Sequence, residues 1–95
     1  MFTVYAIKSI EHKFIYVGMT GNLQERLRQH NLKYVISTKR FAPFTLIYSE
    51  ECADGIIARE KEKYSKSSTG KKFLYSLIDK LPEKEESTLS LLAFL

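Results

Sequence analysis

The stretch that decides the fold is residues 2–18, FTVYAIKSIEHKFIYVG, which holds two runs rich in β-branched and aromatic residues. Residues 2–8 and 13–18 have the composition of β-strands, and the polar break between them has the composition of a turn. Two strands joined by so short a connection pair in an antiparallel manner. The sequence therefore predicts a β-hairpin at the start of the chain.

The register of this hairpin decides where its two tyrosines point. If Ile10 and Glu11 form the centre of the turn, residues that face each other have numbers that sum to 21, and Tyr5 lies opposite Tyr16. Because side chains alternate between the faces of a strand, both rings then project from one face. A shift of one residue would place them on opposite faces.

A helix is predicted over about residues 22–33, directly after the hairpin. Asn22, followed three residues later by Glu25, resembles a capping box. At 100° per residue, His30 lies within the apolar stripe and Arg26 lies at its edge. The apolar members of this stripe are Leu23, Leu27 and Tyr34. The buried side of the helix is thus predicted to carry two polar residues.

The rest of the chain predicts an α/β (α+β) fold. Residues 44–49 form a short and almost wholly apolar run, which we expect to be a third strand in the interior of the sheet with both faces covered. Helical patterns follow over about residues 53–65 and 69–81. We expect a three-stranded, mostly antiparallel sheet flanked by helices.

The second helix carries a carboxylate among its apolar positions. Its apolar stripe contains Ala53, Ile56, Ile57 and Tyr64, and Glu60 lies between the last two on the same face. A buried carboxylate needs either a metal ion or a partner such as a lysine or a tyrosine. Both interpretations stay open on the residues alone.

Composition narrows the class of protein. A chain of 95 residues holds one core, which we place in residues 2–81. Residues 82–95 form a tail that is first acidic and then apolar. We expect this tail to be either a short docked helix or a mobile segment, and its apolar part could support a homodimer. The net charge of +4 favours polyanionic partners. The single Cys52 excludes an internal disulfide, and no membrane span or signal peptide is evident, so we expect a cytoplasmic protein without a membrane partner.

Two tripeptides and a spaced pair of residues are similar to a known family. Thr3-Val4-Tyr5 and Tyr16-Val17-Gly18 lie on adjacent predicted strands, and Arg26 is followed four residues later by His30. In this pattern the chain resembles the GIY-YIG nucleases, and in particular their small single-domain branch, which is similar to the N-terminal catalytic module of an excision-repair excinuclease. The resemblance covers residues 2 to about 81 and implies the GIY-YIG fold.

The resemblance also implies catalytic roles. Glu60 would hold one divalent cation, Mg²⁺ or Mn²⁺, and Arg26 would neutralise the phosphate in the transition state. Tyr5 would take a proton from water, since nearby cations favour its phenolate, while Tyr16 and His30 orient the water or the phosphate. His30 is an alternative base, because its ordinary pKa of about 6.5 needs no such help.

Further residues are candidates for binding the substrate. Gly18 would let a phosphate approach the backbone closely. The basic candidates, which are surface charges that suit phosphate contacts, are Lys33, Lys39, Arg40, Lys71 and Lys72.

We expect the protein to be a metal-dependent endonuclease that hydrolyses DNA, although RNA is not excluded as a substrate. Specificity for DNA structure and a link to repair or recombination are further expectations. Larger members of the family carry an asparagine after the metal-binding glutamate, and residues 65–81 contain none. That difference motivates an alternative, a nucleic-acid-binding module that cleaves weakly or not at all. A third alternative is a protein-interaction domain that uses the apolar tail.

Overall fold

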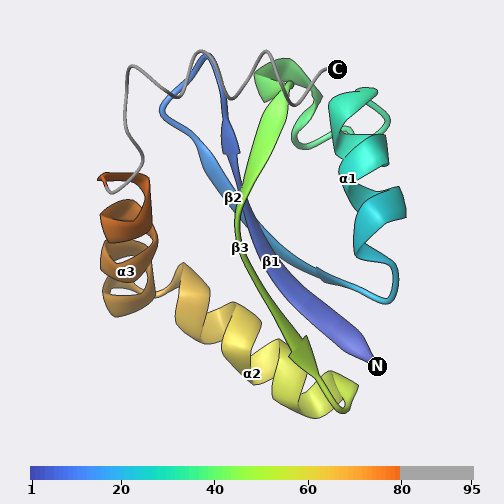
Figure 1. The fold of residues 1–95 in the computed structure, drawn as a ribbon, viewed down its shortest axis with the longest axis vertical. Helices are drawn as coiled ribbons and strands as arrows, with labels where there is room; N and C mark the ends of the chain where they lie inside the picture. Colours follow the sequence, from blue (N-terminus) through green and yellow to red (C-terminus); the bar gives the residue numbers. More distant parts are fainter. Residues whose placement is uncertain (80–95) are drawn as a thin grey trace.

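The computed structural model describes residues 1–79, which form a three-stranded antiparallel sheet with helices on both faces (Figure 1). The elements in chain order are β1 (Phe2–Ser9), β2 (Ile15–Thr20), α1 (Leu23–Asn31), the short 3₁₀ helix η1 (Lys39–Phe41), β3 (Phe44–Cys52), α2 (Gly55–Lys66) and α3 (Ser68–Asp79). The expected α/β (α+β) architecture is confirmed. The end of the last helix at residue 81 and the tail 82–95 lie outside the described residues. Within residues 1–79, no helix is long and apolar enough to cross a bilayer.

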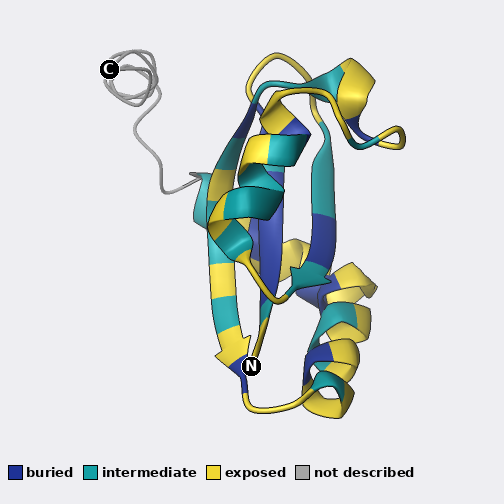
Figure 2. Ribbon diagram, turned by 90° about the vertical axis from the view of Figure 1, so that its right-hand side faces the viewer, coloured by how far each residue is buried: buried dark blue, intermediate teal, exposed yellow. Residues whose placement is uncertain are grey.

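Strand β1 lies at the centre of the sheet, in the order β2-β1-β3. Val4 and Ala6 face one side and pack with α2 and α3, whereas Tyr5 and Ile7 face the other side, which α1 covers. All four are at most 1% exposed. Figure 2 shows this burial concentrated in the central strand, and the sheet therefore has one core on each face.

The prediction that residues 44–49 form an interior strand is wrong. β3 lies at an edge of the sheet, continues to Cys52, and leaves Leu46 40% exposed. Successive residues of β1 point to opposite faces of the sheet, and β1 carries apolar residues on both faces. Placing β1 in the centre therefore buries more apolar surface than placing β3 there.

The predicted hairpin register is also wrong, by two residues. Tyr5 pairs with Gly18 and Ile7 pairs with Tyr16, because the connection is longer than expected and closes where the Ser9 N–H donates to the Phe14 carbonyl at 2.9 Å. A shift of two residues preserves the alternation of faces. Tyr5 and Tyr16 therefore still lie on the same face, as diagonal rather than direct neighbours.

Both ends of α1 are set by local hydrogen bonds. The Asn22 side chain accepts from the Glu25 backbone N–H at 3.2 Å, which confirms the predicted N-cap. The capping box does not form, because the Glu25 carboxylate contacts Arg28 and the Asn22 N–H donates to the Thr20 hydroxyl. The helix stops at Asn31, short of residue 33, because Lys33 adopts a left-handed φ of 66° and the next N–H donates back to the Gln29 carbonyl at 2.9 Å. Lys33 thus ends the helix through its backbone.

Candidate active site

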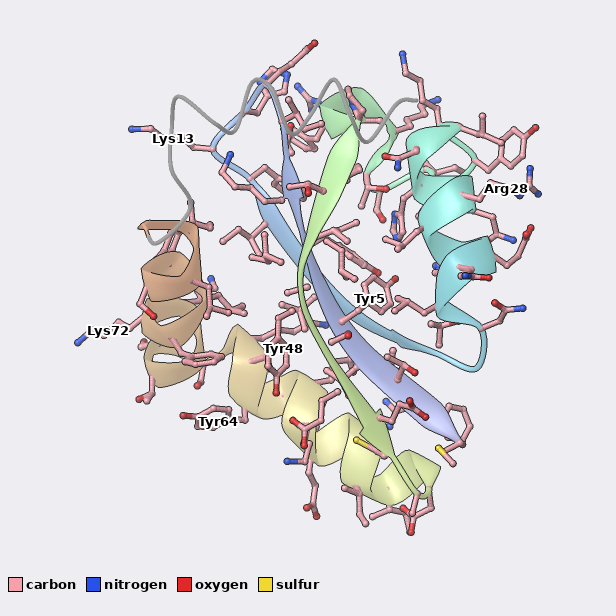
Figure 3. The ribbon with its side chains drawn as sticks, viewed as in Figure 1. Tyr5, Lys13, Arg28, Tyr48, Tyr64 and Lys72 are labelled. Carbon is pink, nitrogen blue, oxygen red and sulfur yellow. The ribbon has the colours of Figure 1, made fainter. Side chains whose placement is uncertain are left out.

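The centre of the site is a buried hydrogen bond between a strand and a helix. The Tyr5 hydroxyl on β1 lies 2.8 Å from Nε2 of His30 on α1, and neither residue is more than 1% exposed. The Tyr16 ring completes the group, with its centroid 5.1 Å from that of His30 and 6.2 Å from that of Tyr5. Figure 3 shows Tyr5 pointing from the sheet toward α1. The structure therefore brings together these three predicted residues.

A fourth residue, Thr38, supports His30 and was not predicted from the sequence. Its hydroxyl lies 2.8 Å from Nδ1 of His30 and 3.5 Å from the Val35 carbonyl, and its side chain is fully buried. Thr38 belongs to the segment between α1 and η1, which has no regular period. The position of Thr38 depends on how that segment folds back against α1. In the sequence, only the hydrogen-bonding capacity of its hydroxyl group indicated a possible role.

The partners of these groups assign a direction to the hydrogen-bond chain. We assign the imidazole proton of His30 to Nδ1, because in that tautomer the Tyr5 O–H has an acceptor, Nε2, 2.8 Å away. His30 then carries its proton on Nδ1 and donates it to the Thr38 hydroxyl, whose own proton points to the Val35 carbonyl. This arrangement makes His30 an acceptor for the Tyr5 proton.

The protonation states agree with that direction. Burial, assisted by the charge of Arg26, lowers the pKa of His30 to about 4, so the imidazole is neutral at pH 7. Burial raises the pKa of Tyr5 and outweighs the opposing effect of Arg26. Arg26 favours the Tyr5 phenolate, as expected, but the loss of hydration on burial is the larger effect, and the net shift of the Tyr5 pKa is upward.

Arg26 lies one turn before His30 and is only partly buried. Its Nη1 donates to the Gln29 side-chain oxygen at 3.1 Å, which holds the guanidinium in place. Tyr16 is likewise partly exposed, whereas Tyr5 and His30 are covered. A ligand therefore has access to this cluster from the side of Arg26 and Tyr16.

The prediction that Glu60 shares a buried face with Ile57 and Tyr64 is wrong. Glu60 is exposed, and Ile57 and Tyr64 are 41% and 56% exposed. The buried residues of α2 are Ala58 and Ser65. Small side chains let this helix lie close to the sheet, and that close packing, rather than the bulky apolar residues, sets which face is buried.

Glu60 instead lines a separate open pocket beside Phe2 and Met19. Burial is the main cause of the raised pKa of Tyr5, and the charge of Glu62 on α2 adds the smallest contribution to it. The Glu62 side chain is 18% exposed and lies 3.5 Å from Nζ of Lys66. Its spacing of four residues from Ala58 is the sequence signal that would have placed it on the inner side of α2.

The acidic residues in the described part of the chain suit only one type of metal site. Residues 1–79 contain no group of three or more His, Cys, Asp or Glu that could hold a metal ion. Mg²⁺ and Mn²⁺ retain several water ligands and need only one or two carboxylates. Glu62 fits such a site as a single carboxylate, whereas a zinc site would need more protein ligands.

The predicted basic residues surround the molecule rather than join the cluster. All are exposed: Lys33 follows α1, Lys39 and Arg40 lie on η1, and Lys71 and Lys72 lie on α3, on the opposite face of the sheet from α1. Gly18, by contrast, lies directly at the site. A Cβ atom there would lie 2.8 Å from the Tyr5 hydroxyl oxygen.

A comparison with protein families agrees with this geometry. The family model described as the GIY-YIG catalytic domain matches residues 1–76. The chain belongs to the GIY-YIG family. The resemblance to the GIY-YIG family is thereby confirmed, and this GIY-YIG domain is a nuclease domain whose substrate class is nucleic acid. No curated protein and no solved structure matches the chain.

Substituting Gly18 in this GIY-YIG domain tests the packing of the site. In Gly18→Ala the new methyl group would meet the Tyr5 hydroxyl at 2.8 Å and Tyr16 Cε2 at 2.9 Å. Because Tyr5 is buried and hydrogen-bonded, we expect a destabilisation of about 1–3 kcal/mol, measured by urea unfolding. The control is Gly21→Ala, whose methyl group meets nothing within 4 Å. Equal stability of the two variants would contradict the packing described.

Proposed function

We propose that this protein is a divalent-metal-dependent endonuclease that hydrolyses phosphodiester bonds, in DNA foremost, at the cluster of Tyr5, Tyr16, Arg26 and His30. The observation that carries the proposal is the buried 2.8 Å contact between the Tyr5 hydroxyl and a neutral His30. A tyrosine that must accept a proton needs a base behind it, because its own pKa is far above neutral pH. His30 supplies that base.

The proton transfer runs through Tyr5. A water molecule that enters between Arg26 and Tyr16 gives a proton to the Tyr5 oxygen as the Tyr5 proton moves to Nε2 of His30. The hydroxide formed attacks phosphorus, and the 3′ oxygen leaves. Thr38 accepts a hydrogen bond from Nδ1 of His30, which keeps Nε2 free to receive the proton. In this scheme Tyr5 and His30 act together as the general base, a role that the sequence alone did not assign to one or the other.

Arg26 acts on the phosphate. Its planar guanidinium is permanently charged, and it can donate two hydrogen bonds to nonbridging oxygens as negative charge accumulates on them. The same phosphate would offset the charge by which Arg26 lowers the pKa of His30. Substrate binding therefore makes His30 a better proton acceptor.

For the metal ligand we propose Glu62 in place of Glu60. The support is the partial burial of Glu62 and its electrostatic influence on Tyr5. A bound Mg²⁺ or Mn²⁺ supplies Lewis-acid stabilisation of the leaving oxygen. Glu62 would hold the ion, and Lys66, which pairs with Glu62, would be displaced from it.

A role on branched, nicked or damaged DNA in repair or recombination, in the cytoplasm, is part of this proposal. Its support is the net charge of +4, which favours a polyanionic partner, and the link to repair carries over what the sequence resemblance implies. A second candidate function is a nucleic-acid-binding module that cleaves slowly. The raised pKa of Tyr5 favours this second candidate, because it opposes loss of the Tyr5 proton and therefore formation of the base that would deprotonate water.

Paired arginine variants test the proposed function. Cleavage of labelled single-stranded, duplex and branched DNA, and of RNA, would be measured in Mg²⁺ or Mn²⁺. We expect Arg26→Ala to cleave about 10²-fold more slowly, as for other transition-state donors. Arg28→Ala removes the same charge from an exposed position where the side chain contacts Glu25, and Figure 3 shows Arg28 pointing away from the sheet.

We expect Arg28→Ala to retain the wild-type rate. Equal losses in the two arginine variants would contradict the proposed role of Arg26. Binding without cleavage in either metal would favour the second candidate.

A further inference from the structure

A groove lies between β2 and α3, the helix on the opposite face of the sheet from α1, and Tyr16 of the catalytic cluster is one of its lining residues. Its larger part is a pocket of about 490 Å³. The residues that give the pocket its character are Tyr16 of the cluster, Lys13, Lys66, Lys71, Leu74 and Tyr75. An adjoining pocket of about 270 Å³ shares Lys13 and Tyr75 with the first and has an apolar lining that includes Phe14 and Ile78. Tyr16 lines the first of these two adjoining pockets.

The charge of this groove suits a polyanion. Lys13 and Lys71 make no salt bridge with any other residue of the described range 1–79, and Lys66 pairs with Glu62 at 3.5 Å, near the upper limit for such a pair. Three ammonium groups around one groove repel each other, and phosphate groups would relieve that repulsion. The groove therefore favours a ligand with several phosphates.

The shape of the groove suits bases that are not paired. Tyr75 is 51% exposed and borders both pockets, so its ring is available for stacking. Exposed aromatic rings beside lysines are how proteins bind single strands, whose bases can turn outward. In a duplex the bases are stacked and paired inside the helix and cannot enter pockets of this size.

We propose that this groove binds an unpaired nucleic-acid strand that leads to the scissile phosphate. Lys13, Lys66 and Lys71 contact its phosphates, and Tyr75 stacks on a base. This inference rests on the proposed function for the position of the scissile phosphate, but the groove and its binding can be tested without cleavage.

The test is binding of the full chain to a fluorescent single-stranded oligonucleotide and to the matching duplex, measured by anisotropy in EDTA so that no metal-dependent cleavage occurs. We expect wild type to prefer the single strand. We expect Lys13→Ala/Lys71→Ala to bind the single strand at least about 10-fold more weakly, with a dependence on salt that is shallower by roughly 1.4 units of slope. Tyr75→Ala should weaken binding by about 5- to 100-fold through the lost stacking.

Two controls match these variants. Lys63→Ala removes an exposed charge from α2, and Tyr64→Ala removes an exposed ring from the same helix. Neither residue lines the groove. We expect both controls to bind the single strand almost as wild type does.

Three results would overturn the proposal: equal binding of duplex and single strand by wild type, equal losses in the groove variants and their controls, or no loss in Tyr75→Ala. Failure of the proposed function is distinguishable, because it appears as absent cleavage in Mn²⁺. A chain that binds through the groove without cleaving would support the groove and contradict the nuclease proposal.

Discussion

Replacing Tyr5 with phenylalanine is expected to lower the single-turnover rate of DNA cleavage by about 10³-fold, within the range for loss of general acid-base catalysis. The variant keeps the ring that packs beside Tyr16 and removes only the hydroxyl that contacts His30. Without that oxygen, the proposed proton path lacks the group that contacts Nε2 of His30 at 2.8 Å. Quenched-flow cleavage of a labelled oligonucleotide in Mn²⁺ measures the rate.

The control for this experiment is Tyr34→Phe, which removes a hydroxyl from a side chain that is 66% exposed. Tyr5→Phe also leaves Nε2 of His30 without its donor, so we expect a loss of about 1–3 kcal/mol in the free energy of unfolding. Urea unfolding separates that loss from the loss of rate. A folded Tyr5→Phe that cleaves at the wild-type rate would rule out Tyr5 as part of the proton path.

Glu62→Gln is expected to lower the cleavage rate by about 10²-fold or more and to raise the Mn²⁺ concentration needed for half-maximal rate. The amide keeps the shape of the side chain but removes the negative charge that attracts the cation. The same substitution breaks the ion pair with Lys66, which, being partly exposed, contributes at most about 1 kcal/mol. A metal titration of the cleavage rate measures both effects.

Glu60→Gln is the matched control, two residues away on the same helix. Because Glu60 is exposed and lines a different pocket, we expect its variant to keep the wild-type rate and the wild-type dependence on Mn²⁺. If Glu60→Gln loses activity while Glu62→Gln retains it, the metal ligand is Glu60 and the assignment made from the helix phase is wrong.

Features of the fold that depend on near neighbours in the chain were predictable. Asn22 caps α1 through a hydrogen bond three residues away, and the alternating pattern of residues 2–8 places Tyr5 on one face. The hairpin register and the position of β3 were not predictable in the same way. They depend on the length of the turn and on which strand gains most from burial on both faces, and both are properties of the assembled sheet.

The residues of the candidate site also differ in whether local sequence patterns could predict them. His30 was placed on the buried side of α1 by helical periodicity alone. Thr38 was missed because it lies in an irregular segment, and Glu62 was missed because α2 packs through the small residues Ala58 and Ser65. Hydrophobic periodicity identifies a buried face only when bulky side chains make the contact.

The most direct test of water-mediated hydrolysis at this cluster is to follow the oxygen of water into the product. The wild-type chain would cleave a DNA oligonucleotide in H₂¹⁸O with Mn²⁺, and mass spectrometry would measure the label on the new 5′-phosphate. We predict one ¹⁸O atom on each new 5′-phosphate, a free 3′-hydroxyl, and no cleavage in EDTA. Unlabelled phosphate ends, or cleavage that persists in EDTA, would contradict metal-dependent hydrolysis by this protein.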